Sequence, residues 1–210
     1  ELADRIERGG IALGHVDVGG GIGIRYRDEP QRSIDEFLGG ALRALGARQK
    51  TLIVDPGRSI VGNAGALLTR VQYVKPGDTR NFLVVDAAMN DLLRPALYDA
   101  WHEVRPVREL QASAAISVYD VVGPICESAD FLARDRKLAA DPGDLLAIMS
   151  AGAYGMSMSS NYNSRPRAAE VMVDGAGAHL VRRREQVPEL FAGESIPAWR
   201  NGHNDKGQHD

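Results

Sequence analysis

HVDVGGGIGI, residues 15–24, decides the fold, because three consecutive glycines follow an apolar run there. The apolar run begins at residue 11 and predicts a buried strand. Glycines lack a Cβ, so their backbone N–H groups at the end of such a strand can approach a phosphate closely. The stretch therefore predicts a strand that leads into a ligand-binding loop, and the alternative is a tight turn without a ligand.

Two strand–helix units can be traced around this loop. Residues 2–8 predict a helix that ends at Gly9 and Gly10, and residues 33–49 carry apolar side chains at helical spacing. TLIVD, residues 51–55, predicts a second short, apolar strand. The order helix, strand, loop, helix, strand, loop indicates a parallel sheet covered on both faces, as in an α/β protein or barrel.

The glycine loop matches no nucleotide-binding fingerprint. Counting from Gly19, the sixth position of Gly-x-Gly-x-x-Gly is Ile24, and Gly-Lys-Ser/Thr does not occur. The second loop, DPGRSIVGNAG at residues 55–65, offers the backbone of Gly57 and the guanidinium of Arg58, which suit a carboxylate or phosphate. Two such loops at one end of a parallel barrel favour an anionic ligand, although Arg58 could instead pair with the aspartate that opens its loop.

A β-domain is expected from residue 67 to residue 187. Two Pro-Gly-Asp turns, at residues 76–78 and 142–144, are each followed within a few residues by an apolar strand. Further strands are expected within residues 114–126 and 167–185. The predicted domains are therefore barrel units at 1–66, a mainly antiparallel β-domain at 67–187, and a polar, disordered tail at 188–210.

Composition excludes several classes of protein. The 210 residues are 44% hydrophobic and 25% charged, with a formal net charge of −3. This balance gives no sign of nucleic-acid binding, and no apolar run approaches the ~20 residues that span a bilayer. A single cysteine argues against a disulfide-stapled secreted domain and indicates a cytoplasmic protein. The first residue is not methionine, so we expect the chain to begin inside a longer or processed protein.

Three motifs in the β-domain carry candidate functional groups. MNDLLRPALYDAWHE, residues 89–103, spaces Arg94 and Tyr98 as i, i+4 neighbours, which share a face if the stretch is helical. Tyr154 lies among small residues, where its ring could pack on a ligand or its hydroxyl could reach a phosphate. Cys126 and Glu127 lie together in GPICESAD. Each motif has a structural alternative: a surface Arg–Tyr pair, a packed aromatic ring and a buried thiol.

Taken together and in this order, the motifs resemble the diaminopimelate decarboxylases, enzymes that use pyridoxal 5'-phosphate and have an alanine racemase-like fold. The resemblance covers residues 10–185 and rests on five stretches: HVDVGGGIGIRY, DPGRSIVGNAG, VDAAMNDLLRPALYDAWHE, GPICESAD and SAGAYGMSMSSNYNSRPRAAEV. It implies the carboxyl-terminal part of a TIM-type (β/α)8 barrel followed by the β-domain. The implied reaction converts meso-2,6-diaminopimelate to L-lysine and CO₂.

The resemblance also implies roles for individual residues. The cofactor would be held by Gly19, Gly20, Gly21, Asp55, Pro56, Gly57, Arg58 and Tyr154. The substrate would be bound by Arg58, Arg94, Tyr98, Glu127 and Tyr154. Cys126 would be the catalytic general acid, which acts in the partner subunit's site of a homodimer. A second amino-acid end on the substrate requires both a carboxylate binder and an ammonium binder, which the arginines and Glu127 provide. No metal is expected.

Two departures from the family pattern stand out. Asp55 replaces the glutamate that family members have there. None of the four lysines has the context of the Schiff-base lysine, which lies in the amino-terminal half of family members; they are Lys50, Lys75, Lys137 and Lys206. A pyridoxal enzyme without that lysine loses its covalent anchor, so we expect this chain alone to be inactive. The alternatives are an ornithine- or arginine-type decarboxylase and a non-catalytic homologue that binds another subunit.

Overall fold

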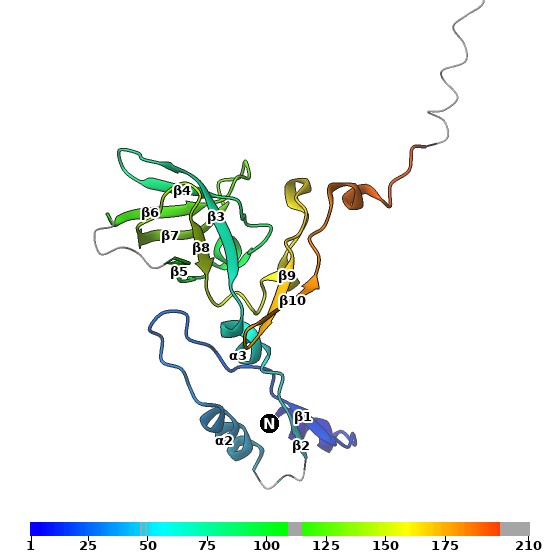
Figure 1. Cartoon of the computed structure of the whole chain (residues 1–210). Coiled ribbons are helices and arrows are strands. Elements are labelled where there is room, and N and C mark those ends of the chain that lie inside the picture. The colour runs from blue at the N-terminus through cyan, green and yellow to red at the C-terminus, as the bar shows by residue number, and fades with distance from the viewer. Residues whose placement is uncertain (47, 49, 109–114, 198–210) are drawn as a thin grey trace, which may run out of the picture. The chain divides into compact units, whose positions relative to one another are not determined.

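The computed structural model describes residues 1–46, 48, 50–108 and 115–197 (Figure 1). It divides into two compact units, Glu1–Ser159 and Ser160–Asp210, which are described separately. This division falls within the expected β-domain, and the boundaries expected after residues 66 and 187 remain predictions. No helix in the described part of the chain is both long enough and apolar enough to cross a membrane.

The first unit begins with the two expected strand–helix units. Their elements are α1 (Leu2–Arg8), β1 (His15–Asp17), α2 (Ile34–Leu45) and β2 (Thr51–Ile53). Strands β1 and β2 pair in parallel, with Val16 opposite Leu52. Parallel neighbours need a crossover connection, and α2 lies in that connection. The predicted parallel arrangement of the two strands is therefore confirmed.

Helix α2 shows why its sequence begins a helix where it does. The Ser33 side chain accepts a hydrogen bond from the Glu36 amide, and the Glu36 carboxylate accepts one from the Ser33 amide. This reciprocal capping box satisfies two backbone donors that would otherwise lack partners. The helix ends at Gly46, whose φ of 65° suits glycine. Residues 47 and 49, at the end of the expected helix, lie outside the described residues.

The burial expected for these two strands is wrong. His15 and Asp17 are exposed, and Val16 and Leu52 are only half-buried. A parallel strand becomes buried only when further strands flank it and helices cover both faces. The sheet formed by β1 and β2 has two strands within the described residues, so it lacks that cover.

Short helical turns connect the second strand to the β-domain. They are α3 (Gly57–Val61) and η1 (Gly62–Ala64). The segment after strand β8 packs closely against α3, because a Cβ on Gly152 would lie 1.9 Å from the carbonyl oxygen of Val61. Only glycine fits at this contact. The backbone that carries Tyr154 is thereby held next to the helical turn that carries Arg58.

Six strands form the main sheet of the first unit (Figure 1). They are β3 (Leu67–Lys75), β4 (Asn81–Val85), β5 (Val104–Pro106), β6 (Ser117–Val122), β7 (Phe131–Leu138) and β8 (Leu145–Ile148). Their order is β5-β8-β3-β4-β6-β7, and every pair is antiparallel except β4 with β6. The mainly antiparallel sheet is confirmed, and each Pro-Gly-Asp turn is followed by a strand, β4 or β8, as expected.

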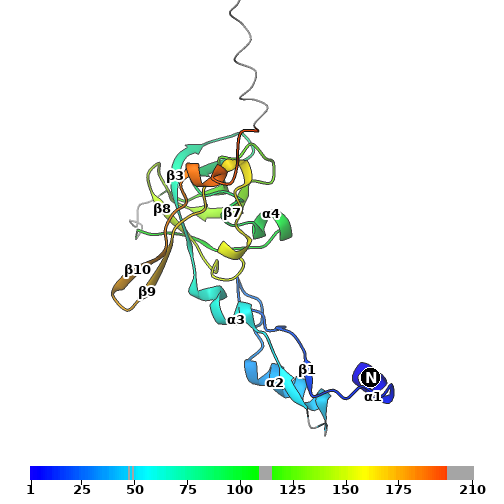
Figure 2. The same cartoon turned by 90° about the vertical axis from the view of Figure 1, so that its right-hand side faces the viewer.

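The core lies against this sheet and is aliphatic. Its fully buried side chains include Leu83, Leu132, Leu146 and Ile148. Each such side chain stabilises the fold by roughly 1.5–3 kcal/mol relative to an exposed position. Helix α4 (Arg94–Tyr98) packs near β7 (Figure 2). The sheet therefore provides a rigid base for the residues on α4 and on the loops around it.

The second unit contains an antiparallel ribbon of β9 (Glu170–Asp174) and β10 (Gly177–Arg182), visible in Figure 2. Two turns, η3 (Tyr162–Ser164) and η4 (Val187–Phe191), flank the ribbon, whereas η2 (Met156–Met158) belongs to the first unit. The strands expected within residues 167–185 are confirmed. Of the tail expected to be disordered, residues 188–197 are described and include part of η4, and residues 198–210 lie outside the described part.

Candidate active site

The two predicted phosphate-binding loops lie against each other. The Asp55 amide donates a hydrogen bond to the Gly19 carbonyl oxygen over 3.3 Å. A Cβ on Gly20 would lie 2.6 Å from the Asp55 carbonyl oxygen, which is too close for any residue but glycine. The expectation that the loops converge at the ends of parallel strands is therefore confirmed, whereas their binding role remains a prediction.

Polar groups at these loops lack protein partners. Among the described residues, nothing hydrogen-bonds to the amides of Gly20 and Gly21. The Nε of Arg58 is buried and is also without a partner in the described part of the chain. A buried polar atom without a partner costs about 1–3 kcal/mol, so such an atom often marks a site completed by a ligand. These donors suit an anion.

Arg94 is one of the few charged residues that are buried among the described residues of the first unit. It begins α4, and only 8% of its surface is exposed. Its guanidinium donates a hydrogen bond to the Tyr26 hydroxyl and lies 5.2 Å from the centre of the Tyr26 ring. The Tyr154 ring lies 5.7 Å from it. Arg94 therefore lies close to two aromatic rings from distant parts of the sequence.

No carboxylate among the described residues pairs with Arg94. A buried charge without a counter-ion is destabilising, and the faces of aromatic rings compensate it only in part. An anionic ligand would supply the missing charge. The planar fork of arginine is well suited to holding a carboxylate with two hydrogen bonds.

His102 packs against Tyr26, the residue that accepts the hydrogen bond from Arg94. Its side chain is fully buried, and its ring meets the Tyr26 ring edge-to-face, with 5.3 Å between the ring centres. Nδ1 lies 2.9 Å from the Met149 carbonyl oxygen, which can only accept, so the proton is on Nδ1. Burial is the main factor that lowers the pKa of His102, and the nearby charges of Arg94 and Arg136 lower it further. His102 is therefore neutral near pH 7.

Tyr98 contrasts with Arg94. The predicted helical turn is confirmed, since both residues belong to α4 and Pro95 lies in its first turn. Tyr98 is 63% exposed, however, whereas Arg94 is buried. Tyr154 is intermediate at 46%. The structure thus brings Arg94 and Tyr154 together and leaves Tyr98 facing solvent.

Cys126 and Glu127 lie on an exposed loop after β6. Asp130 shapes this loop, since its buried carboxylate accepts hydrogen bonds from the Ile125 and Met89 amides, each over 2.7 Å. Cys126 is exposed, so the alternative of a buried thiol is wrong. No described contact joins Cys126 to Arg94 or Tyr154.

The lysines occupy structural positions where they are described. Lys50 pairs with Glu7 and donates to the Leu13 carbonyl oxygen over 2.8 Å, with its side chain 9% exposed. Lys75 ends β3 and Lys137 lies in β7, while Lys206 lies outside the described residues. None of the described lysines contacts the residues around Arg94.

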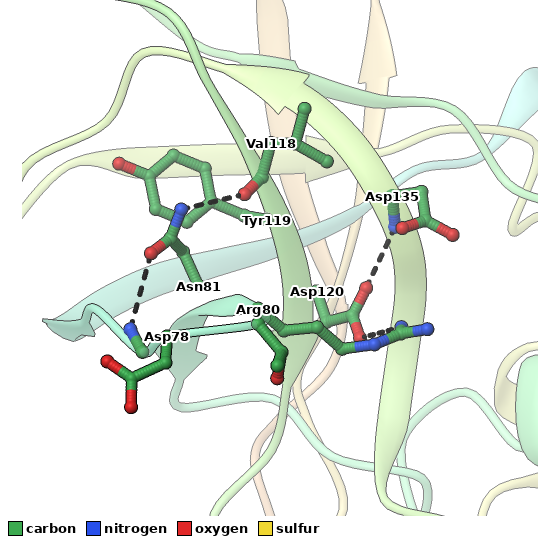
Figure 3. A pocket seen from close by; sticks show the side chains of 9 residues that line it. Asp78, Arg80, Asn81, Val118, Tyr119, Asp120 and Asp135 are labelled. Carbon is green, nitrogen blue, oxygen red and sulfur yellow. Dashed lines mark hydrogen bonds and ion pairs between the residues drawn. The ribbon is translucent and has the colours of Figure 1, made fainter.

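A separate hollow lies between the β3–β4 turn and strands β6 and β7 (Figure 3). Arg80 donates to Asp120 over 2.8 Å there, and Asp120 accepts from the Asp135 amide over 2.8 Å. Asn81 donates to the Val118 carbonyl oxygen over 3.3 Å. These polar groups satisfy one another, and none of the predicted site residues lines this hollow.

Sequence reasoning missed Tyr26 and His102 as parts of the site. Tyr26 lies directly after the glycine loop, and His102 lies four positions after Tyr98. Their residue types and positions in the quoted motifs were visible in the sequence. Their importance depends on contacts between distant segments, which neither periodicity nor spacing shows.

Comparison with known proteins agrees with this geometry. Residues 15–152 match the model of the family described as "Pyridoxal-dependent decarboxylase, C-terminal sheet domain". That match covers the glycine loop, the six-stranded sheet and α4. The chain therefore belongs to this family of pyridoxal-dependent decarboxylases.

Similar proteins point to one enzyme within the family. The chain is 57% identical over 195 residues to the diaminopimelate decarboxylase of Pseudomonas aeruginosa and 52% identical over 193 residues to that of Neisseria meningitidis. These alignments cover 93% and 92% of this chain but 46% and 47% of the relatives. The chain thus spans about half the length of the curated relatives it matches.

Solved structures of diaminopimelate decarboxylases are also similar to this chain. Diaminopimelate decarboxylase from Helicobacter pylori, complexed with L-lysine, matches 91% of this chain and 47% of its own, with a TM-score of 0.82 and 42% identity. The enzyme from M. jannaschii in co-complex with L-lysine has a TM-score of 0.83 and 35% identity, over 93% of this chain and 46% of its own.

Proposed function

We propose that this chain is the carboxyl-terminal half of a diaminopimelate decarboxylase, which converts meso-2,6-diaminopimelate to L-lysine and CO₂. The observation that carries the proposal is Arg94, a buried cation that no carboxylate of the described residues neutralises. High identity to diaminopimelate decarboxylases supports the same substrate.

The substrate-binding residues divide between the two ends of the substrate. Diaminopimelate has two amino-acid ends, and one of them stays intact in the lysine product. Arg94 would bind the carboxylate of the intact end, with Arg58, Tyr98 and Tyr154 as further contacts. Glu127 would bind its ammonium group. Binding both groups would select diaminopimelate over ornithine, which has no distal carboxylate.

The described residues fit pyridoxal 5'-phosphate. Gly19, Gly20 and Gly21, with residues 55–58, would hold its phosphate, for which the amides of Gly20 and Gly21 and the Arg58 Nε are available. Tyr154 would contact the cofactor as well as the substrate. When bound, the cofactor supplies a sink for the electrons that the departing carboxylate leaves behind. Asp55, in place of the family glutamate, keeps the acidic group on a shorter side chain.

Cys126 would act as the general acid. After CO₂ leaves, its thiol would donate a proton to the α carbon, which yields lysine with retention of the distal end. Cys126 is exposed on its loop and is not joined to Arg94 by any described contact. This arrangement supports the proposal that Cys126 and Glu127 enter the site of a second copy in a homodimer.

The proposed whole enzyme contains a TIM-type barrel, of which α1, β1, α2 and β2 would be the last units. The parallel pairing of β1 with β2 supports this assignment. A single, exposed cysteine supports a reducing, cytoplasmic setting. None of the described lysines hydrogen-bonds to the two glycine-containing loops or to Arg94, so we expect the 210-residue chain to be inactive by itself.

The test is CO₂ release from meso-diaminopimelate by the complete gene product, meaning the whole polypeptide encoded around these residues. We expect lysine and CO₂ in equal amounts, little turnover of ornithine, and no turnover by the isolated chain. Preference for ornithine or arginine would favour the other decarboxylases. Absence of any decarboxylation, with the protein folded and supplied with pyridoxal phosphate, would favour a non-catalytic binding partner.

A further inference from the structure

Arg94 reaches its position through a contact between two segments of the first unit. It begins α4, and the residue that accepts its hydrogen bond, Tyr26, follows the glycine loop. The segment of Tyr26 is itself anchored, because Ile22 and Ile24 are buried and the Tyr26 amide donates to the Glu29 carboxylate over 3.0 Å. Tyr26 therefore presents its hydroxyl to Arg94 from a fixed backbone.

His102 fixes the ring that carries this hydroxyl. The Nδ1–H bond to Met149 prevents the imidazole from turning, and the imidazole packs edge-to-face on Tyr26. The carbonyl oxygen of His102 also accepts hydrogen bonds from Arg136, over 3.0 and 3.2 Å. His102 is thus held at both its side chain and its backbone.

We propose that Tyr26 and His102 are positioning residues that aim the Arg94 guanidinium at the carboxylate of the intact amino-acid end. The inference rests on the proposed function, because it takes Arg94 as the carboxylate binder. Arginine has five N–H donors, and the Tyr26 hydroxyl occupies one of its terminal nitrogens. The guanidinium is then restricted in rotation while other donors remain for the carboxylate. Preorganisation of this kind increases affinity because less conformational freedom is lost on binding.

The neutrality of His102 matters for Arg94, because a neutral neighbour leaves the charge of Arg94 available to the substrate. Groups facing it are the Tyr26 ring, the Met149 carbonyl oxygen and the charges of Arg94 and Arg136. The edge-to-face contact of His102 holds the Tyr26 ring without placing a charged acceptor beside Arg94. A carboxylate at this place would neutralise Arg94 permanently and prevent substrate binding. Histidine provides rigidity without that competing charge.

The binding of L-lysine compared with that of cadaverine distinguishes a role in positioning Arg94 from a role in the stability of the fold. L-lysine has one carboxylate, whereas cadaverine has the same chain and amino groups without it. Calorimetric titration of the complete gene product with each amine reports the carboxylate contact directly. Tyr26→Phe removes only the hydroxyl, and Tyr119→Phe is the matched control, because Tyr119 is half-buried and its hydroxyl has no partner among the described residues.

We expect Tyr26→Phe to weaken lysine binding by ~10-fold, as expected for losing a hydrogen bond to a charged group. Cadaverine binding should be unchanged, whereas the melting temperature should fall, because a buried Arg94 donor loses its partner. Tyr119→Phe should bind both amines as the wild type does. His102→Asn, which keeps a donor for Met149 but removes the ring, should also weaken lysine selectively.

Equal loss of affinity for both amines, or unchanged lysine binding in Tyr26→Phe, would overturn the positioning role of Tyr26. An unchanged ratio of lysine affinity to cadaverine affinity in a folded His102→Asn protein would overturn the positioning role of His102. Failure of the wild type to bind lysine would instead count against the proposed function. The two failures are therefore distinguishable.

Discussion

Arg94 donates a hydrogen bond to the hydroxyl of Tyr26, a residue 68 positions earlier in the chain. This bond joins the segment after the glycine loop to the helix that follows β4. The predicted cofactor loops and the predicted substrate residues therefore share one connected region of the first unit. The same bond leaves the charge of Arg94 unneutralised, since a tyrosine hydroxyl is not an anion.

Replacing Arg94 should weaken substrate binding without lowering the stability of the fold. Arg94→Met should raise the KM for diaminopimelate by about 100-fold or more, because a buried charged hydrogen-bonding group is lost. Thermal stability should stay equal or increase, since an uncompensated buried cation is removed. Steady-state kinetics and thermal unfolding of the complete gene product measure both effects.

The control is Arg105→Met, which removes an exposed Arg105–Glu103 pair and should change neither the KM nor the thermal stability. A large loss of stability in Arg94→Met would identify Arg94 as structural.

The glycine loop offers a matched pair of substitutions. Gly20→Ala places a methyl group 2.6 Å from the Asp55 carbonyl oxygen, whereas at Gly23 the same methyl group meets nothing within 4 Å. Gly20→Ala should therefore force the two loops apart and weaken pyridoxal phosphate binding by at least ~10-fold, as expected when a polar contact to a charged group is lost. Gly23→Ala should bind the cofactor normally. Equal cofactor affinities, measured by spectroscopic titration, would exclude these loops as the phosphate site.

The loop of Cys126 depends on a buried carboxylate. Asp130→Asn keeps one acceptor oxygen but turns an amide group toward a backbone donor, so it should destabilise the fold by about 1–3 kcal/mol. Asp135→Asn is the control, because Asp135 is exposed and its φ of 55° is tolerated by asparagine. Thermal unfolding compares the two variants. A destabilisation no greater than that of Asp135→Asn would show that Asp130 does not hold the loop.

The proposed proton donor is tested by a small change. Cys126→Ala should reduce kcat by 100-fold or more, within the ~10²–10⁴-fold range of general acid catalysis. Cofactor binding should stay nearly intact, because Cys126 lies outside the two phosphate loops. Cys126→Ser, with a much less acidic hydroxyl, should also be slow. Turnover equal to the wild type would remove Cys126 from the acid role.

His102 gives the stability of the fold a defined dependence on pH. Burial lowers its pKa below the ordinary value of 6.5, so the unfolded chain binds this proton more readily than the folded chain does. Stability is therefore complete above pH 6.5 and falls as the pH drops below that value. Carboxylates with a lowered pKa, such as Glu189 with a pKa of about 2, lose their stabilising contribution only when the pH falls below the ordinary glutamate pKa of 4.5.

Thermal unfolding between pH 7 and pH 5 measures the effect of His102. The slope should be absent in His102→Asn and preserved in His15→Asn, since His15 is exposed at the start of β1. The same slope in all three proteins would show that other groups cause it.

Local pattern predicts much of this fold, whereas the contacts within the site depend on the tertiary structure. Apolar runs and Pro-Gly-Asp turns correctly predicted β4, β6, β8, β9 and β10, because strand and turn preferences are local. Strands β5 and β7 were not predicted. Burial of β1 was mispredicted, because an apolar run does not show whether neighbouring strands cover it. The unneutralised charge of Arg94 could not be predicted either. It depends on which carboxylates the fold brings near, and no spacing within α4 contains that information.

The most direct test of the account is a crystal structure of the complete gene product with L-lysine bound. We predict that the lysine carboxylate lies within hydrogen-bonding distance of the Arg94 guanidinium, with the Tyr26 hydroxyl still bonded to Arg94. A lysine carboxylate bound elsewhere, with Arg94 paired to a carboxylate of the protein, would contradict the account.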